Sequence, residues 1–426
     1  MPATVPIDSA NALTINAGLG SDTIRFVTGL NAMWLPNLTV NGDAGSDLIH
    51  LPGTRLLVQT DQNLDMNLTD DAASGDVDRL LLEPVSRIFV TGTGNADIRV
   101  SGDIWLDYDC TINAEDGNLL IEANWNTSSS GNFAGIHLGP FTYLGVLNGA
   151  TSSGAVTIRA RGGDTGSGNH GIYSYGGSII GGDSGPLVIE GAGGLSGGDD
   201  NAGLYFADHP QLHQVILGWG CDITVTGTGG GLGSSANNPG VFLEEMIHSD
   251  LGDLTLTGTG GGSTGTGNDG LVVDNYVTSE ANITVSGMTG GGTDAVDIYV
   301  PQSLTAVAFY APNGTVSLHS PVGGMTPSPT SGRLLVNGAQ SAFAAGSRFN
   351  YHIHSASVQQ PVNLFAPINL NGAELNVIGS GYVPQVGDVF MVAENFLPGP
   401  VQGTFSMNGV PLPQGAAITG LLGSSA

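Results

Sequence analysis

Short runs of alternating apolar and polar residues recur along the middle of the chain, about thirty residues apart. The first of them, at Leu119 and Val156, are rich in leucine, isoleucine and valine. Successive side chains of a strand point to opposite faces, so this alternation predicts strands with one buried face. The expected strands start at nearly even intervals, at Leu119, Val156, Leu187, Ile223, Leu254, Ile283 and Val316.

A second strand is expected near the middle of each unit, and a small residue, usually glycine, precedes it. The expected starts are Ile136, Ile172, Leu204, Val241, Leu271 and Val296. A weaker third strand follows at 179–180, 215–216 and 276–277. Helical periodicity is nearly absent, and the best short candidate for a helix lies near 242–248.

A long repeat with two or three short strands per unit predicts stacked coils, in which each strand pairs in parallel with the coils above and below. Glycine would supply the corners of each coil. The alternative is an antiparallel sandwich, but its hairpin signals at intervals of about 8–12 residues do not recur. We therefore expect residues 119–320 to form regular solenoid repeats of about thirty residues.

The flanking parts of the chain are less regular. Residues 1–118 are expected to form irregular coils of the same kind, because 13–16 and 38–41 are matching strands, and both lead into glycine and then Ser-Asp. Residues 321–329 contain three prolines and two glycines, which predicts a break. Beyond this break the repeat is lost, so 330–426 is expected to be a separate β-rich module.

Several segments resemble a known group of proteins. Residues 223–231 (ITVTGTGGG) and 254–262 (LTLTGTGGG) resemble repeats of very large exported bacterial proteins, of the filamentous-haemagglutinin-like and autotransporter-passenger-like types frequent in planctomycetes. Residues 13–24 (LTINAGLGSDTI) resemble their strand, Gly-x-Gly-x-Asp, strand units. The module that often closes such passengers is similar to 368–377, Pro384, 387–390, 403–405 and 414–416. The resemblance implies export, an all-β, right-handed parallel β-helix with a C-terminal cap-like module, and a surface or adhesive role.

Composition limits the partners. The chain has 69 glycines in 426 residues and is 40% hydrophobic, which is enough for a core. It has 37 acidic residues against nine basic ones, all arginine. Such a surface repels nucleic-acid phosphates and anionic headgroups, and no run of 18 apolar residues occurs, so we expect neither nucleic-acid binding nor membrane insertion. Carbohydrates, other cell-surface components and divalent cations remain as partners.

Two further features concern export. Cys110 and Cys221 are expected to be isolated buried thiols, with a single disulfide as the alternative. Residues 1–6 carry no signal-peptide pattern, and one interpretation is that the chain is a segment of a longer exported protein, a question that the sequence leaves open. The expected location is extracellular or at the cell surface.

A calcium site is one hypothesis for the N-terminal coils, although no cofactor is required. Residues 18–24 (GLGSDTI) and 42–49 (GDAGSDLI) are imperfect copies of the calcium-binding repeat G-G-x-G-x-D-x-U. The two copies are too far apart in the sequence to be the tandem nonapeptides that this repeat needs. Stacking of neighbouring coils would still align Asp22 with Asp47. The alternative is that both aspartates are turn residues.

Catalytic patterns are weak. Asp199 and Asp200 are a possible acid pair of a polygalacturonase-like site, but the companion Gly-His-Gly and Arg-x-Lys elements are missing. His352 and His354 are expected on one face of a strand, and His209 and His213 are expected in one loop. A zinc site needs a third or fourth ligand at suitable spacing, and the sequence shows none for either pair. No Ser-His-Asp order and no CxxC pair is present.

The last candidate is a ladder of hydroxyl side chains. Thr224, Thr226, Thr255, Thr257, Thr284 and Ser286 occupy outward positions of successive first strands. A flat array of this kind can bind ice or a polysaccharide, although threonine is also an ordinary residue of strand surfaces.

We therefore expect a non-catalytic, secreted or cell-surface structural or adhesin-type solenoid. Two alternatives remain. One is a carbohydrate-active β-helix enzyme, such as a polysaccharide lyase, a glycosidase or a tailspike-like depolymerase. The other is an ice- or surface-binding solenoid.

Overall fold

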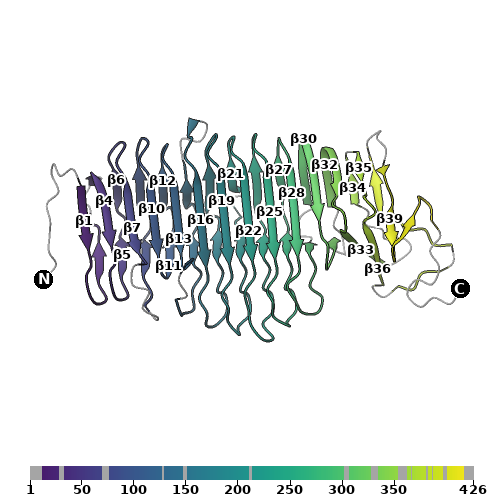
Figure 1. Cartoon of the computed structure of the whole chain (residues 1–426), viewed down its shortest axis with the longest axis horizontal. Coiled ribbons are helices and arrows are strands. Elements are labelled where there is room, and N and C mark those ends of the chain that lie inside the picture. Colours follow the sequence, from purple (N-terminus) through teal and green to yellow (C-terminus); the bar gives the residue numbers. More distant parts are fainter. Residues whose placement is uncertain are drawn as a thin grey trace.

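The computed structural model describes residues 12–27, 33–69, 76–126, 129–146, 151–210, 214–301, 307–327, 334–353, 362–365, 367–379, 382–385, 387–396 and 401–416. Within these ranges the chain is all-β and has no α-helix. The strands stack one coil upon the next along a single long axis, and β1 (Ala12–Asn16) and β39 (Phe405–Met407) lie toward opposite ends of the stack (Figure 1).

Each coil contributes strands to three columns. The first column contains β1 (Ala12–Asn16), β4 (Asn37–Asn41), β7 (Leu64–Leu68), β10 (Ala96–Val100), β13 (Leu119–Ala123), β16 (Val156–Arg161), β19 (Leu187–Ala192), β22 (Ile223–Thr228), β25 (Leu254–Thr259), β28 (Ile283–Met288), β35 (Ile368–Asn369) and β38 (Val401–Gln402). The third column contains β3 (Met33–Leu35), β6 (Arg55–Val58), β9 (Arg87–Val90), β12 (Thr111–Ala114), β15 (Tyr143–Gly145), β18 (Ser178–Gly181), β21 (Gln214–Gly218), β24 (Met246–Ser249), β27 (Val277–Ser279), β34 (Val362–Leu364) and β37 (Ala393–Asn395). Strands β30 (Val307–His319) and β32 (Leu334–Phe343) pass through both columns, which together form a 25-stranded sheet.

The second column forms a separate 15-stranded sheet. It contains β2 (Thr23–Arg25), β5 (Leu48–Leu51), β8 (Arg79–Leu82), β11 (Asp103–Leu106), β14 (Ile136–Leu138), β17 (Ile172–Tyr175), β20 (Leu204–Ala207), β23 (Val241–Leu243), β26 (Leu271–Val273), β29 (Ile298–Val300), β31 (Met325–Pro327), β33 (Arg348–Ile353), β36 (Glu374–Gly379), β39 (Phe405–Met407) and β40 (Val410–Leu412). Described neighbours pair in parallel except β39 and β40, which are antiparallel. The predicted parallel β-solenoid is therefore confirmed.

The register of the first column is the one that the sequence predicts. Each predicted start from Leu119 to Val316 pairs with the start in the next coil. The predicted match of 13–16 with 38–41 is also confirmed. A slip by one residue would exchange the buried and solvent faces, so the alternation of apolar residues fixes this register.

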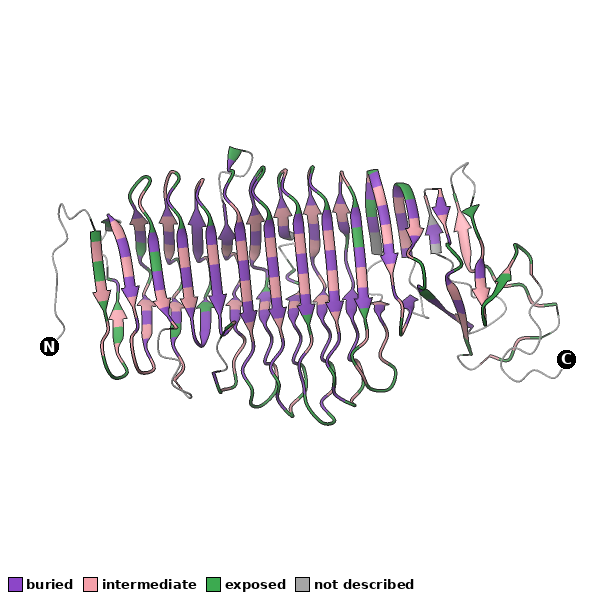
Figure 2. Ribbon diagram, viewed as in Figure 1, coloured by how far each residue is buried: buried purple, intermediate pink, exposed green. Residues whose placement is uncertain are grey.

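The core runs along the inside of the stack (Figure 2). In the first column its aliphatic side chains lie directly above one another, and Ile158, Ile189, Val225, Leu256 and Val285 are all 0% exposed. Burying each such side chain contributes roughly 1.5–3 kcal/mol of hydrophobic free energy. The core therefore holds successive coils together without any helix in the described ranges.

Two details of the second and third columns differ from the predictions. The candidate helix near 242–248 is wrong, because this segment forms the ends of β23 and β24 around a turn. The last of the six second-column strands that the sequence predicts begins at Ile298, not Val296, and Ile298 pairs with Leu271. Asp297 takes the position that glycine holds in the preceding coil, and its carboxylate accepts hydrogen bonds from the backbone N–H groups of Val322 and Gly324.

The expected loss of the repeat after 321–329 is also wrong for the described strands. Met325 pairs in parallel with Ile298, and β32 pairs in parallel with β30 and then with β34 and β35. Pro327 is the last residue of its strand, beyond the Met325–Phe349 pair that joins β31 to the next coil. The domain boundaries at 118 and 330 stay predictions.

Both cysteines are free and buried, as expected. Burial raises the pKa of the Cys110 thiol to about 11 and that of the Cys221 thiol to about 11. A thiol with this pKa is uncharged at neutral pH, and we expect both cysteines to react slowly in the folded chain. No helix in the described part of the chain is long and apolar enough to cross a membrane.

Candidate functional site

The predicted hydroxyl ladder forms two columns on the outer face of the first strands. Thr224 pairs with Thr255 and then with Thr284, while Thr226 pairs with Thr257 and then with Ser286. These side chains are half-buried, except that Thr284 is exposed. The next coil continues both columns with Ser317 and His319. The array is thus in register, and its ability to bind a ligand stays a prediction.

The same column carries alternating charges in the preceding coils. Arg99, Glu122, Arg159 and Glu190 occupy successive positions, followed by Thr226. The Arg159 guanidinium lies 3.6 Å from Glu122 and 2.6 Å from Glu190. The Arg99 guanidinium lies 3.5 Å from Glu122. These ion pairs link neighbouring coils. The charged side chains next to the hydroxyl ladder are therefore paired with one another.

Asp22 and Asp47 lie in neighbouring coils at matching positions, as the calcium hypothesis requires. The Asp22 backbone N–H donates to Asp47 Oδ1 at 2.7 Å, and the Asp47 N–H donates to Asp78 Oδ1 at 2.6 Å. Asp47 is 2% exposed. Because the Asp47 carboxylate accepts a backbone N–H, it serves as a turn residue. Calcium binding by Asp22 and Asp47 stays a prediction.

The other predicted polar groups do not form a cluster. Asp199 Oδ1 accepts the N–H of Ala236 in the next coil, and Asp200 has a φ of 62°. His352 lies on β33, whereas His354 and His213 lie outside the described residues. Among the described residues, no group of three or more His, Cys, Asp or Glu side chains is placed to hold a metal ion.

An asparagine ladder, which the sequence reasoning missed, stabilises the glycine-rich turns. Asn169, Asn201, Asn238 and Asn268 are all 0% exposed. Each of the first three asparagines donates two hydrogen bonds, from its backbone N–H and from its side-chain N–H, to the Oδ1 atom of the asparagine in the next coil. The donor–acceptor distances are 2.8–3.2 Å, and the pairs run from Asn169 to Asn201, from Asn201 to Asn238 and from Asn238 to Asn268. Each asparagine lies two positions before the glycine that precedes a second-column strand. That recurrence was a readable signal.

An aromatic ladder, also missed, lies on the outer face of the second column. Trp105, His137, Tyr173, Tyr205 and Phe242 occupy one register position in five coils. Their ring centroids are 3.7, 5.2, 5.7 and 4.7 Å apart, with interplanar angles of 22° or less. Each pair contributes about 0.5–1.5 kcal/mol beyond area burial. Because the ring faces cover one another, the ladder presents mainly ring edges to solvent.

Glu245 is a buried carboxyl group in the turn between β23 and β24. It is 0% exposed, and its Oε1 accepts the backbone N–H of His209 at 2.8 Å. Burial raises its pKa to about 7, and the charges of Asp208 and Glu244 add to this effect. A carboxyl group with this pKa is partly protonated near neutral pH, as a general acid is. However, a fully buried carboxyl group cannot contact a polymeric substrate.

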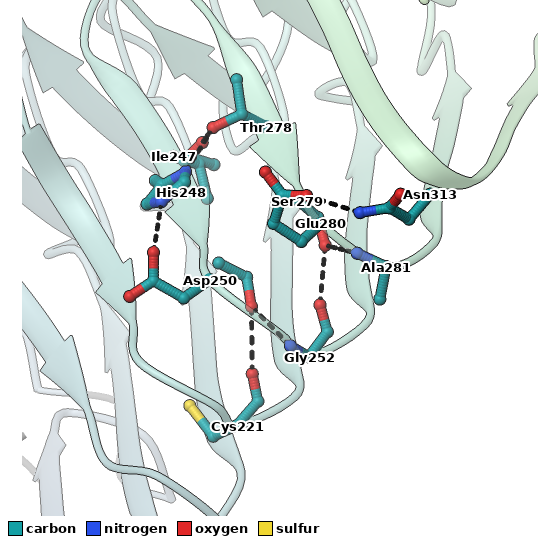
Figure 3. Close-up of polar contacts among 11 residues, drawn as sticks. Cys221, Ile247, His248, Asp250, Gly252, Thr278, Ser279, Glu280, Ala281 and Asn313 are labelled. Atoms are coloured by element: carbon teal, nitrogen blue, oxygen red, sulfur yellow. Dashed lines mark hydrogen bonds and ion pairs between the residues drawn. The ribbon is translucent and has the colours of Figure 1, made fainter. Parts of the chain in front are cut away.

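Three side chains of the third column form a hydrogen-bonded relay, shown in Figure 3. His248 Nε2 lies 2.7 Å from Asp250 Oδ1, and His248 Nδ1 lies 2.7 Å from Thr278 Oγ1. Thr278 is in register with His248 in the next coil. A hydroxyl, an imidazole and a carboxylate in this order are the elements of a nucleophilic triad. His248 and Asp250 are two residues apart in the sequence, but sequence order gave no sign of Thr278, which meets His248 only through the stacking of coils.

The relay lacks other parts of an acyl-transfer site. The Thr278 hydroxyl also donates to the backbone oxygen of Ile247 at 3.3 Å. An oxyanion site needs backbone N–H groups that are free to donate. The backbone N–H groups around Thr278 belong to a parallel sheet, in which they are used in strand pairing. The geometry therefore fits a structural network that fixes Asp250 better than it fits a nucleophile.

Comparison of the chain with known protein families, with curated proteins and with solved structures found no match in any of the three.

Proposed function

We propose that this chain is a non-catalytic structural solenoid of adhesin type, secreted or displayed at the cell surface. The observation that carries the proposal is the continuous coil-to-coil bonding of its polar side chains. The asparagine ladder, the ion pairs around Arg159 and the aspartate turns all bond to the next coil. Side chains used in this way stabilise a long stack and leave few groups for chemistry.

The winding of the coils is right-handed in this proposal, and the C-terminal module closes the stack. Support for the handedness comes from the strong preference for right-handed crossovers between parallel strands of one sheet. Support for the closing role comes from β39 and β40, whose antiparallel hairpin ends the second-column sheet. A hairpin at this end protects a sheet edge that would otherwise pair with another chain.

Carbohydrates and other cell-surface components are the proposed contacts of the solenoid. A net charge of −28 disfavours polyanionic partners and leaves neutral or cationic surfaces. The second candidate, a carbohydrate-active enzyme, is favoured by His248, whose imidazole Asp250 orients in the geometry of a general base.

The test measures adhesion and hydrolysis together. The purified chain is incubated with cellulose, chitin and chitosan particles, and retained protein and released soluble sugar are measured. We expect retention on at least one surface and no release of reducing ends. Release of reducing ends or unsaturated sugars that a His248→Ala substitution abolishes would replace this proposal with the enzyme. Absence of retention on every surface would contradict the adhesive role.

A further inference from the structure

Strand β1 is the first described strand at one end of the stack, and it forms an open sheet edge (Figure 1). Strands β1, β2 and β3 pair with β4, β5 and β6 of the second coil, and no described strand pairs with their other side. At the opposite end, β40 pairs with β39 as an antiparallel hairpin. The first coil therefore presents backbone N–H and C=O groups that another strand can pair with.

The inward side chains of the first coil are incompletely buried. Ile15 and Ile24 pack against the core but stay partly exposed. Their register partners in the second coil, Val40 and Ile49, are both 0% exposed. The second coil is buried because a coil covers it on each side, so a further layer of strands over the first coil would remove these apolar side chains from water.

A carboxylate also points toward this open end. At the corner before the second column, each aspartate accepts a backbone N–H from the coil before it. Asp47 Oδ1 accepts from Asp22, and Asp78 Oδ1 accepts from Asp47. Asp22 holds the same position in the first coil, where it precedes Thr23 as Asp47 precedes Leu48. Its own carboxylate accepts no hydrogen bond within the described residues, and so it is available to a donor from another chain.

The first coil is electrically neutral and carries one charge of each sign. Residues 9–42 contain one acidic residue, Asp22, and one basic residue, Arg25, so their formal charge is zero. The rest of the chain carries the whole net charge of −28. Arg25 is exposed and forms no ion pair within the described residues. Electrostatic repulsion between two copies of a chain this acidic is therefore weak where their first coils meet.

These features fit a second copy of the same end. A two-fold axis across the end of the stack reverses strand direction, so β1 of one copy meets β1 of the other in antiparallel orientation. Every contact of such an interface occurs twice, and Asp22 of each copy can pair with the partner's Arg25. The opposite end fits poorly, because β40 runs against the direction of the parallel strands. Residues 1–11 are too few to add a coil, since the first coil takes 25 residues.

We propose that two copies of this chain associate head to head through their first coils. Strand β1 of one copy pairs with β1 of the other, the two apolar cores become continuous, and Asp22 pairs with the partner's Arg25. The product is a closed dimer that does not extend into a fibre, because both open edges are used. This inference goes beyond the proposed adhesive function and does not depend on it. The dimer presents each adhesive face twice, which raises the avidity of the solenoid.

The first test is sedimentation velocity of the full chain over a concentration series. We expect a monomer–dimer equilibrium and no larger species. Arg25→Glu places like charges opposite Asp22 and should raise the dissociation constant of the dimer at least about tenfold, as loss of a charge-assisted contact implies. Arg161→Glu is the matched control, because Arg161 forms no ion pair within the described residues and lies five coils away, or about 24 Å. The control makes the same change in charge and should leave the constant within about twofold.

Spin labels identify the ends that meet. Thr14 is exposed on β1, Val410 is exposed on β40, and the native cysteines are buried. Labels on Thr14→Cys should lie within about 20 Å of each other in the dimer, because paired strands are about 4.8 Å apart. Labels on Val410→Cys lie at the two far ends of the dimer and should give no distance in the measurable range.

Three results would overturn the inference. The first is a chain that stays monomeric up to about 100 µM, which would mean that other residues of the same chain cover the edge. The second is an equal effect of Arg25→Glu and Arg161→Glu. The third is a short distance between a Thr14→Cys copy and a Val410→Cys copy, which would show head-to-tail association. Retention on polysaccharide particles is measured separately, so a monomeric chain would leave the adhesive proposal untouched.

Discussion

Replacement of Asn238 by alanine tests the asparagine ladder at its centre. Asn238 Oδ1 accepts the backbone N–H of Asn201 at 3.0 Å and its side-chain N–H at 3.1 Å. Asn238 Nδ2 donates to Asn268 Oδ1 at 2.8 Å. Asn238→Ala removes these three bonds, together with the contacts of the Asn238 side chain with Ser235 Oγ and Ser263 Oγ, and leaves two donors of Asn201 without this acceptor in a buried turn.

The expected cost follows from these bonds. A hydrogen bond contributes about 1 kcal/mol net, and a buried polar group left without a partner costs about 1–3 kcal/mol. Asn238→Ala should therefore lower the free energy of unfolding by about 3–4 kcal/mol. Asn282→Ala is the matched control, because Asn282 is exposed and its Oδ1 accepts the backbone N–H of Thr315 at 3.0 Å. Water replaces that acceptor, so the control should cost less than about 1 kcal/mol.

The assay is urea unfolding together with hydrogen exchange of the Asn201 amide. Exchange is informative because coils of a repeat protein can open locally. In Asn238→Ala the Asn201 amide should exchange faster, while amides of β7 should be unaffected. If both variants unfold within about 0.5 kcal/mol of each other, buried side-chain bonding between coils does not stabilise the stack as we describe.

Three further predictions concern charged groups and thiols. The folded pKa of Glu245 is raised from 4.5 to about 7, so folding favours its protonated form. The contribution of Glu245 to stability should be fully present below pH 4.5 and should fall by up to about 3 kcal/mol as the pH rises through 7. Glu245→Gln should remove this contribution, which a comparison of thermal-melting midpoints at acidic and neutral pH measures. Arg159→Met should cost about 1–2 kcal/mol in urea unfolding by leaving Glu122 and Glu190 without their shared cation, and an unchanged midpoint would refute the ion-pair ladder. Cys110 and Cys221 should react with a thiol reagent only after unfolding, so rapid labelling of the folded chain would contradict their burial.

The stacking of the first column was predictable, because alternation with a period of two fixes which residues face inward. Val225 and Leu256 could be placed above one another from their spacing alone. The same reasoning aligned Asp22 with Asp47, yet it did not predict that Asp47 accepts the Asp22 N–H. The pattern gives the position of a side chain, whereas its bonding depends on backbone geometry at the turn.

Contacts between columns and coils were harder to predict. His248 and Thr278 are far apart in the sequence and meet only because β24 and β27 are adjacent. The lengths of the intervening turns vary from coil to coil, so spacing alone does not identify which third-column residues are neighbours. The shorter C-terminal coils were missed because segments such as Ile368–Asn369 are too brief for an alternating pattern to stand out.

Distances between spin labels along one outward column test the parallel solenoid most directly. Leu120, Thr255 and Ser317 occupy the same register position, and the second and third lie four and six coils from the first. With about 4.8 Å per coil, the Leu120→Cys/Thr255→Cys and Leu120→Cys/Ser317→Cys pairs should be separated by about 19 Å and about 29 Å. The native thiols are buried and should remain unlabelled. We predict that the second pair is farther apart than the first by the rise of two coils, about 10 Å. Equal distances, or a shorter distance for the second pair, would contradict the stacked coils on which every inference above depends.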